Sequence, residues 1–183
     1  VDRPGCDPCQ QDHSRFERCH GAVGSVPEPG ARPGPPGGAM FWASAMASAT
    51  AACADADLTI VSHTATGKVP IKAVSGPGGA LFNYTRQMND AIECITLLIG
   101  GGVLDRNPKA RIMFAEVGAG WLLGLAERMD EVYFGHAPYI QPKLSRLPSQ
   151  ILRDQVYSSF QNDTGCLAIR KLLGLKNMLF ASD

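Results

Sequence analysis

The sequence has no excess of charge of either sign and no long hydrophobic run. Seventeen Lys and Arg residues balance seventeen Asp and Glu residues over 183 positions. The chain therefore lacks the basic footprint that binding to nucleic acid or to an anionic membrane surface requires. No apolar run approaches the ~20 residues that are needed to cross a bilayer. We predict a protein that binds neither nucleic acid nor membrane.

No secretory signal peptide is recognisable at the start of the sequence,. The chain has six cysteines, which are Cys6, Cys9, Cys19, Cys53, Cys94 and Cys166. A secreted disulfide scaffold would be shorter and richer in loops, so we predict reduced cysteines and a cytoplasmic protein. Cys6 and Cys9 have the spacing of the first half of a zinc site, but the second pair of ligands is missing.

The first forty residues differ in composition from the rest of the chain. They hold much of the proline and glycine, and nine of the twelve residues at positions 27–38 are of these two types. Such a composition cannot bury enough apolar surface to offset the entropy lost on ordering the backbone. We predict a disordered arm over residues 1–40 and a folded domain over residues 41–183.

Four short apolar segments of the second region are predicted to be strands, and helical patterns lie between them. The strands are residues 57–63, 110–116, 155–160 and 177–182. Alternation at this spacing predicts an α/β fold, built from βαβ units with right-handed crossovers and a parallel sheet. A closed eight-stranded barrel needs about 250 residues. Residues 41–183 therefore predict about half of such a barrel, with two open sheet edges.

Three predicted strands end in side chains that bind metals or move protons: His63, Glu116 and Asp183. The carboxyl ends of parallel strands collect functional groups, and imidazole nitrogen and carboxylate oxygen suit a divalent ion. Each residue alone also has an ordinary interpretation, as a hydrogen-bonded structural histidine or a solvated acid. Gly118 and Gly120 form a turn after Glu116, without the third glycine of a dinucleotide-binding fingerprint.

Six blocks of sequence, in order, carry a resemblance to a known family. They are residues 61–67, 102–108, 114–121, 127–130, 155–163 and 177–183. From about Phe41 onward the chain resembles the amidohydrolase-related metal-dependent hydrolases, in the branch that includes aminocarboxymuconate-semialdehyde decarboxylase. The resemblance implies a TIM barrel, a divalent metal such as zinc, and hydrolysis or non-oxidative decarboxylation of a small carboxylate or carbonyl substrate.

The resemblance also implies roles for the three strand-end residues. His63 matches the metal ligand on the fifth strand of the family's barrel. Asp183 matches the acid on the eighth strand, which contacts the metal and moves protons. Glu116 stands where many members carry a histidine on the sixth strand, which implies an acid/base or metal-binding role.

One hallmark of the family is missing, because no two of the four histidines are separated by a single residue. The His-x-His pair of the first barrel strand is therefore absent. We expect a carboxyl-terminal fragment of the barrel, with weak metal retention and no turnover of its own. The alternative is a catalytically inactive remnant that self-associates or pairs with a complementing barrel half.

Overall fold

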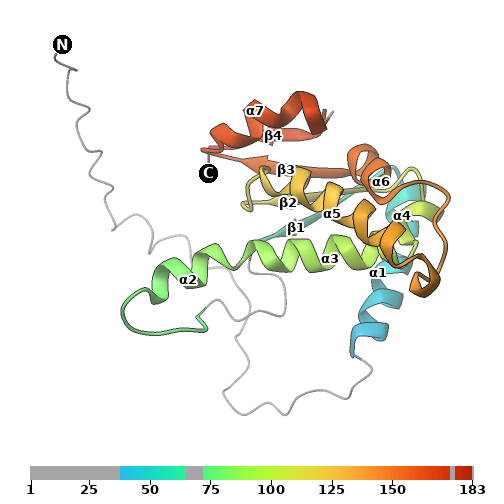
Figure 1. Ribbon diagram of the computed structural model, residues 1–183, viewed down its shortest axis with the longest axis horizontal. Coiled ribbons are helices and arrows are strands. Elements are labelled where there is room, and N and C mark those ends of the chain that lie inside the picture. Colours follow the sequence, from blue (N-terminus) through green and yellow to red (C-terminus); the bar gives the residue numbers. More distant parts are fainter. Residues whose placement is uncertain (1–37, 65–71, 174–175, 183) are drawn as a thin grey trace. The chain divides into compact units, whose positions relative to one another are not determined.

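The structure, a computed structural model, describes residues 38–64, 72–173 and 176–182 (Figure 1). Its elements in chain order are α1 (Gly38–Asp55), β1 (Thr59–His63), α2 (Gly79–Thr85), α3 (Met88–Gly100), α4 (Val103–Arg106), β2 (Arg111–Ala115), α5 (Trp121–Gly135), η2 (Ala137–Tyr139), α6 (Pro148–Gln155), β3 (Val156–Phe160), α7 (Thr164–Leu173) and β4 (Met178–Phe180). The arm predicted over residues 1–40 lies outside the described residues, except for residues 38–40, which begin α1. The domain boundary stays a prediction.

Within these ranges the sheet has four parallel strands in the order β1-β2-β3-β4. Thr59 lies opposite Arg111, Ile112 opposite Val156, and the register continues from β3 to β4. Each strand after β1 pairs with the strand that precedes it along the chain, and helices lie in each crossover. The α/β fold class and all four predicted strands are confirmed.

Helices cover one face of this sheet, and the core lies between them and the strands. Along β2, Ile112 and Phe114 are each 1% exposed, whereas the alternate residues of the strand are only partly buried. Buried residues of α3, α5 and α6 belong to the same hydrophobic cluster. The ring of Phe114 packs edge-on against Trp121, with the ring centroids 6.0 Å apart. The cluster fixes the start of α5 beside the end of β2.

The opposite face of the sheet carries partly exposed apolar side chains. Val61 lies opposite Met113, and Met113 lies opposite Tyr157, so these residues form a row across three strands. Val61 is 59% exposed, and Leu179 of β4 is 40% exposed. In a closed barrel this face would point toward the interior.

Two local predictions about the helices were wrong. Apolar residues at helical spacing over residues 82–99 predict one helix, but the structure divides this stretch into α2 and α3 near Arg86 and Gln87. The aromatic residues and prolines of residues 133–147 predict an irregular connection, which begins later because α5 continues to Gly135. Near the break between α2 and α3, Gln87 accepts a hydrogen bond from Thr64. This contact joins residues 23 positions apart, and helical periodicity cannot predict it.

In the part of the chain that the structure describes, no helix combines the length and apolar character of a membrane span.

Candidate functional site

The site begins where β1 and β2 end side by side. His63 is the last residue of β1 and lies opposite Ala115, and Glu116 follows β2 directly. Because the strands are parallel, both side chains reach the same edge of the sheet. The Nε2 atom of His63 lies 2.9 Å from Oε1 of Glu116. The fold thus joins two residues that are separated by 53 positions in the sequence and that were predicted separately.

The imidazole of His63 contacts an oxygen on each side of the ring. Its Nδ1 atom lies 3.0 Å from the main-chain oxygen of Thr64, and its Nε2 atom faces Glu116. A doubly protonated imidazole would donate to both oxygens, whereas a neutral ring carries only one of these protons. The side chains of His63 and Glu116 are 51% and 35% exposed, so solvent reaches the pair.

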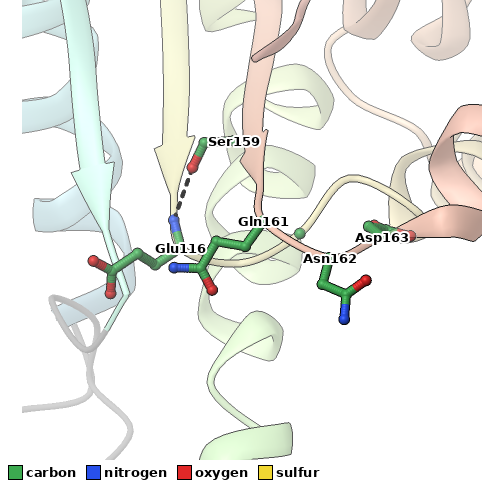
Figure 2. A pocket seen from close by; sticks show the side chains of 6 residues that line it. Glu116, Ser159, Gln161, Asn162 and Asp163 are labelled. Atoms are coloured by element: carbon green, nitrogen blue, oxygen red, sulfur yellow. Dashed lines mark hydrogen bonds between the residues drawn. The ribbon is translucent and has the colours of Figure 1, made fainter. Parts of the chain in front are cut away.

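Glu116 has an unusual backbone conformation for a residue with a side chain. Its φ of 61° lies in the left-handed region, where Cβ crowds the backbone,. Its N–H donates to Oγ of Ser159 at 3.0 Å, and Ser159 is only 3% exposed (Figure 2). This bond links the ends of β2 and β3. Strained residues that their surroundings hold in place occur preferentially at functional sites.

The turn that follows Glu116 is fixed by the next βα unit. Oδ2 of Asp163 accepts the N–H groups of Ala119 and Gly120 at 2.9 and 2.7 Å. Its Oδ1 accepts the N–H of Cys166 at 3.0 Å. Burial alone would raise the pKa of Asp163, but these three backbone donors hold the pKa below its usual value,. Asp163 is therefore expected to stay charged at neutral pH.

A pocket of about 280 Å³ opens at this edge of the sheet. It is lined by Glu116, Gly118, Ser159, Gln161, Asn162 and Asp163. Figure 2 shows the side chain of Glu116 extending from the end of β2 toward β1, with Gln161 and Asn162 following β3. The lining therefore combines two carboxylates with two neutral carboxamides, which both donate and accept hydrogen bonds.

The three sequence-predicted site residues have different outcomes. His63 and Glu116 lie together, whereas Asp183 lies outside the described residues. Over the described ranges, no group of three or more His, Cys, Asp or Glu side chains could hold a metal ion. The pair still offers one imidazole nitrogen and one carboxylate, a donor chemistry that fits part of a divalent-metal site. The possible zinc ligands Cys6 and Cys9 also lie outside the described residues.

Sequence reasoning missed Ser159 and Asp163. Ser159 belongs to the strand pattern of β3. Nothing in that pattern indicates that its hydroxyl accepts a hydrogen bond from the N–H of Glu116 at the end of β2. Asp163 had a detectable signal, because it directly precedes α7 and Asp is a favoured residue before a helix,. That signal predicts its bond to Cys166 but not its bonds to Ala119 and Gly120.

Parallel strands joined in sequence order by helices, with polar side chains at their carboxyl ends, define part of a (β/α)8 barrel. Solved structures with this fold include an amidohydrolase from Mycobacterium avium subsp. paratuberculosis K-10 (TM-score 0.57, 20% identity, 74% of this chain covered). The 5-carboxyvanillate decarboxylase from Sphingomonas paucimobilis is also similar (TM-score 0.55, 17% identity, 71% of this chain covered). The match covers only 35% and 40% of the lengths of those two chains.

These structures confirm the predicted fold, a partial TIM barrel. At 20% identity or less, the likeness extends to the fold alone. No protein-family model matches the sequence. A search of curated proteins also found no match.

Proposed function

We propose that the chain forms the carboxyl-terminal part of a metal-dependent hydrolase or decarboxylase. The observation that carries the proposal is the contact of 2.9 Å between His63 and Glu116 at the carboxyl ends of β1 and β2. This is the edge of a (β/α)8 barrel at which catalytic groups gather. The shared fold with an amidohydrolase and a decarboxylase gives further support.

In this proposal His63 is a metal ligand and Glu116 an acid/base group or a further ligand. Asp183 is the second metal ligand and a proton carrier. The divalent ion, zinc by resemblance, would supply Lewis-acid polarisation of a small carboxylate or carbonyl substrate, and it would take the place of one of the two oxygens that the His63 ring now contacts,. The carboxylate of Glu116 lies beside the ring and orients it, while Gln161 offers uncharged hydrogen-bonding groups to the substrate,.

The proposal is tested by finding where a paramagnetic divalent ion binds the full chain. Two described donors bind far more weakly than the four ligands of a structural zinc site, which contribute roughly 10–16 kcal/mol. A method that locates weak binding is therefore needed. On titration with Mn²⁺, we expect the amide signals of Thr64 and Val117 to broaden before those of other residues.

The control is the double variant His63→Ala/Glu116→Gln, which removes both donors from the same fold. It should lose the selective broadening while keeping the wild-type amide spectrum elsewhere. The surface variant Glu131→Gln alters a carboxylate that pairs with Arg128 on α5, and it should broaden as wild type does. Selective broadening that persists in the double variant, or that arises at another site in wild type, would contradict the proposed metal role.

A second candidate function is favoured by the uncovered face of the sheet. Val61 and Leu179 leave 59% and 40% of their surfaces exposed in the same layer as Met113 and Tyr157. Exposed apolar faces of this kind mark association surfaces. In this alternative the chain is an inactive remnant that pairs with a copy of itself or with a complementing barrel half.

Sedimentation velocity of the full chain tests self-association. We expect a concentration-dependent dimer in wild type, and a monomer for Val61→Glu/Leu179→Glu, because buried charge at the interface is costly. Leu172→Glu is the control, since Leu172 is exposed on α7 and should not affect the dimer. A wild-type chain that stays monomeric at high concentration would eliminate pairing with a second copy.

A cytoplasmic location is also part of the proposal. Within the described chain Cys53, Cys94 and Cys166 are all free thiols. Free thiols are typical of proteins in a reducing compartment. Fractionation of cells that express the protein would test this location.

A further inference from the structure

Asp163 connects two turns that belong to different βα units. One carboxylate oxygen accepts two N–H groups at the entry to α5, from Ala119 and Gly120. The other oxygen accepts the N–H of Cys166 in the first turn of α7. A residue that only capped α7 would need just the last of these bonds. The bonds to the α5 entry therefore require a separate account.

The α5 entry turn begins at Glu116, only three residues before Ala119. At its far end Asp163 holds Ala119 and Gly120, and at its near end Ser159 holds the N–H of Glu116. Between them, the main-chain oxygen of Gly118 accepts a bond of 2.6 Å from Oγ of Ser158. A turn this short, fixed at three points, cannot move at one end without strain at the other.

The packing around the carboxylate is tight enough to transmit a change. A Cβ atom placed on Gly120 would lie 3.1 Å from Oδ1 of Asp163, and one placed on Gly118 would lie 3.3 Å from Oδ2. Contacts this short are closer than ordinary van der Waals distance. Glycine at both positions lets the carboxylate approach the main chain directly.

We propose that Asp163 is a positioning residue that, through the α5 entry turn, holds Glu116 in its left-handed conformation and directs its carboxylate toward His63. Its importance for chemistry rests on the proposed function, whereas the mechanical coupling between Asp163 and Glu116 does not. The competing account is a local one, in which Asp163 stabilises the two helix starts and leaves Glu116 unaffected.

Amide hydrogen exchange of the full chain separates these accounts. In Asp163→Ser, the shorter hydroxyl can still cap α7 at Cys166 but cannot reach Ala119 and Gly120. We expect exchange at Ala119, Gly120 and Glu116 to accelerate by at least about tenfold, because bonds to a charged acceptor are lost. Exchange at Cys166 should stay within about threefold of wild type, since its cap is retained.

The Glu116 amide decides the outcome, because Asp163 does not contact it and a purely local role would leave its exchange unchanged. Acceleration at Ala119 and Gly120 with an unaltered Glu116 would overturn the proposal, as would unaltered exchange at all three. Asp163→Asn keeps one oxygen acceptor, so it should restore part of the protection at Glu116. Ser159→Ala is the positive control, because it removes the acceptor of that amide directly.

Wild-type protein provides a test that does not depend on variants that fold. If the turn opens as one unit, exchange of Glu116, Ala119 and Gly120 should respond equally to low concentrations of urea. Distinct urea responses would contradict the coupling. None of these measurements uses a metal, so absent Mn²⁺ broadening in wild type would remove the proposed function and leave the coupling to be judged separately.

Discussion

At the scale of single residues, the backbone of Glu116 is the most informative feature of the site. A side chain at φ 61° is unfavourable, and four hydrogen bonds between the turn and β3 with its loop maintain the conformation,. The conformation places a carboxylate 2.9 Å from His63, a contact that would be worth little to stability at its partly exposed position,. The strain therefore fits the proposed function of the pair better than a role in folding.

Because the strain serves the proposed site and not stability, Glu116→Gly should keep or raise the stability of the fold while it removes the proposed site. Glycine adopts φ 61° without the Cβ penalty of about 1–2 kcal/mol. Urea unfolding should therefore show equal or greater stability for the variant, while selective Mn²⁺ broadening is lost. The matched control is Glu93→Gly in the middle of α3, where Glu93 is exposed and glycine should cost about 1 kcal/mol,. Equal destabilisation by the two substitutions would show that Glu116 is not strained.

At the scale of elements, helices α5 and α7 share one carboxylate at their starts. Burial raises the pKa of Asp163, but the N–H groups of Ala119, Cys166 and Gly120 outweigh this effect and lower it. A carboxyl group whose pKa is lower in the folded state adds stability above its unfolded pKa of about 3.9. That contribution is lost as the pH falls through the lower folded pKa.

The free energy of unfolding of wild type should therefore fall more steeply below about pH 4 than that of Asp163→Asn. The variant cannot ionise at this position, so it lacks this part of the pH dependence. At pH 7 we expect the variant to be less stable by about 1 kcal/mol, the usual cost of a weakened cap. Urea unfolding at a series of pH values measures both quantities. Parallel curves for the two proteins would contradict the role given to this carboxylate.

The sequence predicted the secondary-structure elements better than it predicted the contacts between them. The four strands follow from short apolar runs, and the observed strands all lie within the predicted ranges. His63 and Glu116 could be predicted as site residues because the carboxyl end of a strand can be located without knowing its neighbours. Asp163 and Ser159 could not be predicted in full, because their partners lie 43 or 44 positions away in the chain. The helix break near Gln87 depends on a similar distant contact with Thr64.

At the scale of the whole molecule, the described sheet has the fold of part of a barrel. Its helical face is covered by a packed core, whereas Val61 and Leu179 on the other face remain accessible. The two similar enzymes are more than twice as long as the region that matches this chain. The open face is therefore the surface on which the proposed self-association depends.

The order β1-β2-β3-β4 has a consequence for synthesis on the ribosome. Each strand after β1 pairs with the strand that was synthesised immediately before it. Its pairing partner is therefore already present when it leaves the ribosome. Pairing joins only neighbouring βα units, so each loop closure is as short as a parallel sheet with helical crossovers allows,. Within the described chain, the sheet can therefore grow in one direction during translation, and each strand after β1 has its partner already made.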